Sequence, residues 1–132
     1  METQAAKSLL IIEDNSDIAE CLLRCFELEN FDTKLARSGE EGLLLSKHNP
    51  PRVILLDVLL PDMNGMEICR RMRSEPATRS SRIIMLSARA SRADIALGLA
   101  AGADAYICKP FSVRDLVERV YDLLGPEGGR RH

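Results

Sequence analysis

Short apolar runs alternate along the chain with longer stretches in which apolar positions recur every three or four residues. The short runs are typical of strands, and the longer stretches are typical of amphipathic helices. Five strands are therefore predicted, each followed by a helix. The predicted strands span residues 9–12, 31–36, 53–58, 83–86 and 105–107.

The helices are predicted largely from signals at their ends. Ser38 and Glu41 form a capping box, and the helix that they open must end before Pro50, which cannot continue it. Gly102 closes the fourth helix, and Ser112 caps the fifth. The first, third and fourth helices are predicted at residues 16–29, 66–73 and 93–101.

The most clearly predicted strand, residues 53–58 (VILLDV), is apolar on both faces. Such continuous apolarity is typical of a central parallel strand that helices cover on both sides. Five alternations of strand and helix predict an α/β fold with a doubly wound, five-stranded parallel sheet and five helices. The order 2-1-3-4-5, as in flavodoxin-like folds, is the common one for five such units. Residues 31–36 are less apolar and are expected near an edge.

Length and composition limit the classes of function. A chain of 132 residues predicts one domain, which we assign to residues 1–125, with 126–132 as a tail or the start of a linker. The 18 basic residues nearly balance the 20 acidic ones, which argues against binding to nucleic acid or to a membrane. The first residues show no secretory pattern, and no apolar run could span a bilayer, so we expect a cytoplasmic location.

Two groups of residues are given structural rather than functional interpretations. The arginines at positions 70, 71 and 73 are expected on a solvated helix face. With only two histidines in the chain, a zinc site is not expected. The cysteines are therefore interpreted as reduced thiols, namely Cys21, Cys25, Cys69 and Cys108.

Polar residues lie at the ends of four of the predicted strands, at the edge where parallel sheets bind ligands. Glu13, Asp14 and Asp57 would bring three carboxylates together there, and Lys109 supplies one positive charge. Two negative charges remain unbalanced, which a divalent cation would neutralise. Because all these ligands are oxygens, Mg²⁺ or Mn²⁺ is expected rather than zinc.

The same edge has the groups that phosphoryl transfer needs. An aspartate carboxylate can attack phosphorus and form an acyl phosphate. The reaction then depends on positioning and on positive charge around the phosphoryl oxygens. A metal ion, the Lys109 ammonium group and the Ser87 hydroxyl would supply these from three sides. Asp57 is therefore predicted to be a phosphoacceptor.

Six segments, in order along the chain, resemble the response regulator receiver domains of two-component signalling. They are LIIED (10–14), LLDV (55–58), PDMNG (61–65), MLSA (85–88), GADAY (102–106) and KPF (109–111). Each segment is weak alone, but all six lie at the expected strand ends. The resemblance covers about residues 8–124 and implies the flavodoxin-like receiver fold, a signalling domain and not an enzyme.

The resemblance implies a role for each acidic residue. Asp57 would accept a phosphoryl group from a phosphohistidine of a sensor histidine kinase or a phosphotransfer protein. Asp14, Asp57 and the backbone carbonyl of Leu59 would bind Mg²⁺ directly, and Glu13 would act through a metal-bound water.

It also implies how the signal leaves the site. Ser87 would hydrogen-bond the phosphoryl group, and Lys109 would pair with it. The peptide bond between Lys109 and Pro110 would be cis. Tyr106 would be the switch aromatic. The fourth helix, fifth strand and fifth helix would form the output face, which controls a partner or an attached output domain. The same face is a candidate for homodimer formation on phosphorylation.

Three positions are variants of the family pattern. Glu13 replaces the more frequent aspartate, and its longer side chain still reaches through water. Ser87 stands where threonine is common, so the missing methyl group leaves its rotamer less restrained and its coupling to Tyr106 looser. Leu59 is apolar and cannot position an attacking water, so self-dephosphorylation is expected to be slow to moderate.

Two other functions fit the sequence less well. An aspartate-nucleophile phosphatase of the haloacid dehalogenase type needs a second aspartate two residues after the nucleophile, where this chain has Leu59. An unphosphorylated pseudo-receiver, serving only as an interaction module, would usually lack part of the acidic cluster or the lysine. Asp14, Asp57 and Lys109 are all present here.

Overall fold

Five parallel strands form one sheet in the order β2-β1-β3-β4-β5, as predicted. The structure is a computed structural model that describes residues 7–125, so the tail assigned to 126–132 lies outside the described residues. The strands are β1 (Ser8–Ile12), β2 (Asp32–Ala36), β3 (Val53–Asp57), β4 (Arg82–Ser87) and β5 (Ala105–Cys108). The helices are α1 (Ser16–Leu28), α2 (Gly39–His48), α3 (Gly65–Ser74), α4 (Arg92–Ala100) and α5 (Val113–Leu124).

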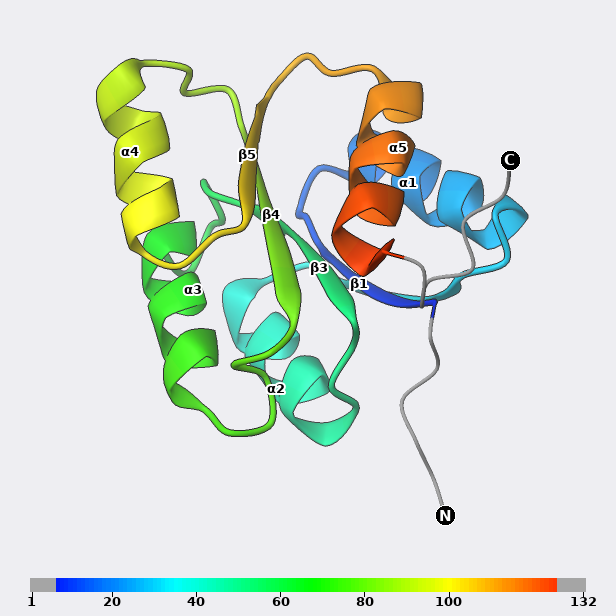
Figure 1. Cartoon of the computed structure of the whole chain (residues 1–132), viewed down its shortest axis with the longest axis horizontal. Coiled ribbons are helices and arrows are strands. Elements are labelled where there is room, and N and C mark those ends of the chain that lie inside the picture. The colour runs from blue at the N-terminus through cyan, green and yellow to red at the C-terminus, as the bar shows by residue number, and fades with distance from the viewer. Residues whose placement is uncertain (1–6, 126–132) are drawn as a thin grey trace.

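The helices cover both faces of the sheet, α1 and α5 on one side and α2, α3 and α4 on the other (Figure 1). Successive residues of a strand point to opposite faces, so β3 contributes side chains to the hydrophobic core on each side of the sheet. Val53 and Leu55 pack with α1 and α5, whereas Ile54 and Leu56 pack with α3. All four side chains are fully buried, which confirms the central position predicted for this strand.

Element boundaries differ from the sequence prediction by about one residue, for local reasons. Phe31 precedes β2 instead of belonging to it, and its ring packs against Phe26 and Tyr121 in the core. Helix α4 begins one residue earlier than predicted because the Ser91 hydroxyl accepts the Asp94 N–H. Within residues 7–125 no helix is long and apolar enough to cross a membrane.

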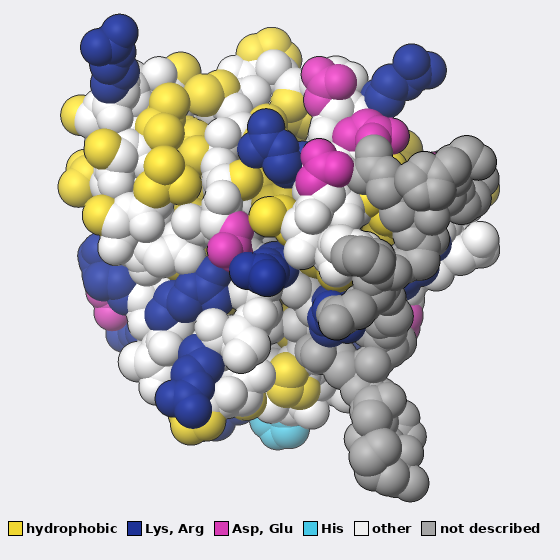
Figure 2. All heavy atoms as spheres, viewed as in Figure 1, with side chains coloured by type: hydrophobic (Ala, Val, Ile, Leu, Met, Phe, Trp, Pro, Cys, Tyr) yellow, Lys and Arg dark blue, Asp and Glu magenta, His cyan; other side chains and the backbone are white. Residues whose placement is uncertain are grey.

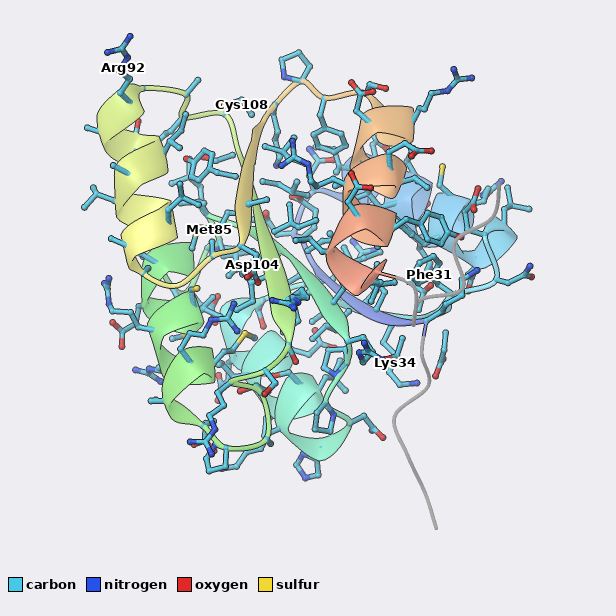
Figure 3. All side chains as sticks on the ribbon, in the orientation of Figure 1. Phe31, Lys34, Met85, Arg92, Asp104 and Cys108 are labelled. Carbon is cyan, nitrogen blue, oxygen red and sulfur yellow. The ribbon has the colours of Figure 1, made fainter. Side chains whose placement is uncertain are left out.

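Arg73 corrects the prediction of a solvated arginine face on α3. Its guanidinium donates to the backbone carbonyls of Gly102, Arg79 and Ser81 and pairs with the Asp104 carboxylate at 2.9 Å. These contacts tie the end of α3 to the start of β5. Figure 3 shows Asp104 just before that end of β5 and Cys108 at the other. All four cysteines are free thiols, as predicted.

Candidate functional site

Asp57 is the last residue of β3 and is 5% exposed. The apolar residues before it fix the strand in the middle of the sheet, and the register places Asp57 opposite Leu86 of β4. Its Oδ1 accepts a 3.2 Å hydrogen bond from the Leu59 N–H. The carboxylate is therefore held at the carboxyl edge of the sheet, where the prediction put it.

Glu13 and Asp14 follow β1, which is hydrogen-bonded to β3. The Glu13 side chain is buried, and its Oε2 accepts the Asn15 N–H at 3.2 Å, whereas Asp14 is exposed. One carboxylate oxygen each of Glu13, Asp14 and Asp57 lies within 4.8 Å of the others. The predicted acidic cluster is thus assembled, with one side open to solvent.

Lys109 reaches into this cluster from the end of β5. Its Nζ lies 3.1 Å from Glu13 Oε1 and 3.6 Å from Asp57 Oδ1. The Lys109 N–H donates to the Ser87 carbonyl at 2.7 Å, and the peptide bond to Pro110 is cis, as the resemblance implied. The single Lys109 ammonium group therefore lies within ion-pair distance of two carboxylates, those of Glu13 and Asp57.

The charges remain unbalanced in spite of Lys109. Burial, and next the nearby Glu13 carboxylate, raise the pKa of Asp57 to about 7, against the lowering effects of the Leu59 N–H and Lys109. Burial disfavours the charged form of Asp57, and the Glu13 carboxylate beside it adds to this effect, so the single Lys109 ammonium group does not compensate the site. Three carboxylates with a solvent-open side fit a hard divalent cation that keeps some of its water ligands.

Ser87 and Tyr106 lie on the same edge but are linked to each other through a third residue. The buried Ser87 Oγ accepts the Arg89 N–H at 3.0 Å, and the Tyr106 hydroxyl donates to the Arg89 carbonyl at 2.8 Å. The Tyr106 ring packs so closely on Gly98 of α4 that a Cβ there would lie 2.7 Å from Tyr106 Cδ2. The site is therefore connected to the α4 side of the sheet.

An apolar pocket of about 510 Å³ opens beside Lys109, between α1 and the segment that joins β5 to α5. Ile18 and Cys21 line it from α1, and Pro110 and Phe111 line it from the other side. This pocket was not predicted, because its two walls are far apart in the sequence. Lys109, which pairs with Glu13 and Asp57, also lines this pocket.

Asp62 is a second feature that the sequence did not reveal. The segment was predicted only as a turn, but the Asp62 carboxylate contacts the beginning of α2, accepting the N–H groups of Gly39 and Glu40. No local signal could have identified this contact, because its partners lie more than 20 residues earlier in the chain.

Comparison with known proteins agrees with this geometry. The sequence model of the response regulator receiver domain matches residues 9–121. The DNA-binding response regulator MtrA of Mycobacterium tuberculosis is 38% identical over 112 residues, which are 85% of this chain and 48% of MtrA. The chain thus spans about half the length of the curated relatives it matches.

Solved receiver structures share the fold. The receiver domain of Francisella response regulator 1452 superposes with a TM-score of 0.84 at 32% identity, covering 89% of this chain and 96% of that one. A CheY-like receiver domain protein from Methanospirillum hungatei gives 0.83 at 31% identity, covering 93% and 97%. With its sheet order, its sequence match and these neighbours in agreement, the chain belongs to the response regulator receiver domain family of two-component signalling.

Proposed function

We propose that Asp57 accepts a phosphoryl group from a phosphohistidine, in a reaction that requires Mg²⁺ or Mn²⁺. The observation that supports this most strongly is the position of the Asp57 carboxylate. It lies buried at a strand end, as one of three clustered carboxylates, with Lys109 Nζ 3.6 Å away. A paired structural aspartate would not need two further carboxylates beside it.

The acidic residues would hold the cation. Asp14, Asp57 and the Leu59 backbone carbonyl would bind it directly, and Glu13, which is engaged with Lys109, would contact it through water. When bound, the cation neutralises the cluster and draws charge from the phosphoryl oxygens. Asp57 would then be ionised at neutral pH and ready to attack.

The chain's own groups account for the transfer. An Asp57 oxygen forms a bond to phosphorus, the bond between phosphorus and the donor's imidazole nitrogen breaks, and that nitrogen keeps the electron pair. Lys109, already within 3.6 Å of Asp57, pairs with the transferred group. The Ser87 hydroxyl donates a hydrogen bond to it, which draws Ser87 away from the Arg89 N–H that it now accepts.

The donor is a sensor histidine kinase or a phosphotransfer protein, in the cytoplasm. The pocket beside Lys109 supports this, because its apolar walls offer a docking surface next to the acceptor carboxylate. Docking there would place a donor side chain at the open side of the acidic cluster. A small donor such as acetyl phosphate would not need the pocket.

The output face is α4–β5–α5, where phosphorylation would act on a partner or an attached output domain, or on homodimer formation. Leu97 and Leu99 of α4 are 60% and 46% exposed, and apolar side chains gather over that helix in Figure 2. The negative charge of the phosphoryl group favours the conformer in which Ser87 and Lys109 close on it. Tyr106 would move with this change, because its hydroxyl is hydrogen-bonded to the Arg89 carbonyl.

Incubation with acetyl phosphate, followed by intact-mass measurement, tests this function. We expect the wild type to gain one phosphoryl mass with Mg²⁺ and none with EDTA, and Asp57→Asn to gain none. No gain in the wild type would instead favour an unphosphorylated interaction module. Hydrolysis of phosphate esters with turnover would favour a phosphatase.

A further inference from the structure

The loop between β3 and α3, residues 58–64, is a closed hairpin. The Gly65 N–H donates to the Val58 carbonyl at 2.8 Å, and Leu59 and Asn64 pair as an antiparallel bridge. Gly65 permits this closure, because a Cβ there would lie 2.7 Å from the Val58 Cα. The base of the loop is therefore fixed by the backbone, directly after Asp57.

The tip of the same loop is attached to a different helix. Asp62 Oδ1 accepts the Gly39 N–H at 2.8 Å, and Oδ2 accepts the Glu40 N–H at 3.0 Å. These are among the first N–H groups of α2, which have no partner within the helix. A negative carboxylate at a helix N-terminus is also favoured by the helix dipole. The two hydrogen bonds lower the pKa of Asp62.

The packing around Gly39 strengthens this attachment. A Cβ at Gly39 would lie 2.8 Å from Ile68 Cδ1 and 3.0 Å from Met63 Sδ. The start of α2 thus lies directly against Met63, the loop residue next to Asp62. The loop is held at two places, at its base by β3 and at its tip by α2.

We propose that Asp62 is a positioning residue, whose carboxylate fixes the loop on α2 and so places Leu59 for the bound cation. The inference rests on the proposed function, which gives the Leu59 carbonyl to the ion. Leu59 is the residue of the loop that contacts Asp57, through its N–H. Release of the tip would let the Leu59 peptide move relative to the carboxylates of the cluster.

Ser38 supplies a matched control. Its hydroxyl caps the same helix by accepting the Glu41 N–H at 3.2 Å, and it precedes α2 in the chain instead of belonging to the loop. Ser38→Ala and Asp62→Ala both remove acceptors from the start of α2, so both should lower thermal stability. Only Asp62→Ala should release the tip of the loop from α2.

Two measurements decide the proposal. In metal-free protein, hydrogen exchange of the amides of residues 59–64 should be faster in Asp62→Ala than in the wild type and unchanged in Ser38→Ala. By calorimetric titration, Mg²⁺ affinity should fall about 10-fold in Asp62→Ala, as for other residues that orient metal ligands, and stay within about 2-fold in Ser38→Ala. Asp62→Asn keeps one acceptor oxygen, so its exchange rates and its Mg²⁺ affinity should lie between those of the wild type and Asp62→Ala.

The failures are distinguishable. Equal exchange and equal Mg²⁺ affinity in the two alanine variants would overturn the role of Asp62 while the proposed function stands. A wild type that binds no Mg²⁺ would overturn the proposed function, and with it the placing of Leu59 for a cation.

Discussion

The Tyr106 hydroxyl donates a 2.8 Å hydrogen bond to the backbone carbonyl of Arg89. The N–H of Arg89 donates in turn to the Ser87 Oγ. If the Ser87 hydroxyl turns toward a phosphoryl group on Asp57, this N–H loses its acceptor and the segment after β4 must rearrange. The bond to Tyr106 therefore connects the proposed phosphorylation site to the proposed output face.

Tyrosine NMR can detect this connection, because the chain has only two tyrosines. In ring-labelled protein with Mg²⁺, addition of beryllofluoride should shift the signal of Tyr106, whose hydroxyl loses the Arg89 carbonyl. Tyr121 is the internal control, since its hydroxyl donates to Glu29 Oε1, and its signal should stay in place. Equal shifts of both signals, or of neither, would contradict the coupling.

The raised pKa of Asp57 predicts how the stability of metal-free protein depends on pH. Below about pH 4 the carboxyl is protonated in both the folded and the unfolded chain. Between 3.8 and about 7 only the folded chain keeps the proton, so the free energy of unfolding falls as pH rises and levels off above pH 7. The loss should be on the order of a few kcal/mol, because each unit of pKa shift corresponds to about 1.4 kcal/mol and burial, the main cause of the shift, disfavours the charged carboxylate.

Asp57→Asn isolates this effect. The amide does not titrate, so the variant should lack this loss and be more stable than the wild type at pH 8 in EDTA. Urea denaturation of both proteins from pH 5 to pH 8 gives the difference directly. An identical pH dependence in the two proteins would show that Asp57 does not hold a proton in the folded state.

Leu59 predicts slow to moderate loss of the phosphoryl group by self-dephosphorylation. Its side chain is 46% exposed next to the site and offers no group that could orient an attacking water. Leu59→Asn should shorten the phosphoryl lifetime about 10-fold, less than the roughly 100-fold or more of a general base, because an amide can orient a water but takes no proton from it. Leu59→Met should leave the lifetime unchanged. Decay is followed by intact mass after removal of acetyl phosphate. A wild-type half-life of only seconds would contradict the prediction.

The pocket beside Lys109 predicts a difference between protein and small-molecule donors. Cys21 is exposed on its α1 wall, so Cys21→Arg should place a long charged side chain at the docking surface. Transfer from a phosphohistidine protein should slow at least about 10-fold, as expected when an apolar contact of roughly 1.4 kcal/mol is lost. The rate with acetyl phosphate should stay within about 2-fold.

Leu28→Arg is the matched control for that variant. It adds the same charge to α1 at the 78% exposed Leu28, near the end of the helix, and should leave both rates unchanged. Equal slowing by the two variants would point to a general effect of charge instead of docking in the pocket.

The sequence predicted most of what local pattern controls. The apolar run before Asp57 predicted a central strand, and the strand ends predicted that Glu13, Asp14 and Lys109 would meet there. Arg73 and Asp62 could not be predicted, because each acts on backbone groups that only the tertiary structure brings near. Arg73 follows the pattern of a surface helix residue, yet it donates to carbonyls of the loop after α3 and of the distant Gly102. Asp62 follows the pattern of a turn.

The most direct test of the account locates the phosphoryl group itself. Protein treated with acetyl phosphate and Mg²⁺ is reduced with borohydride, which converts an aspartyl phosphate to the alcohol, and the tryptic peptide 53–70 is sequenced by tandem mass spectrometry. This peptide contains both Asp57 and Asp62, so reduction at the two aspartates is compared within one peptide. We expect reduction at Asp57 alone. Reduction at Asp62 or elsewhere, or no reduced residue in protein that has gained the phosphoryl mass, would contradict it.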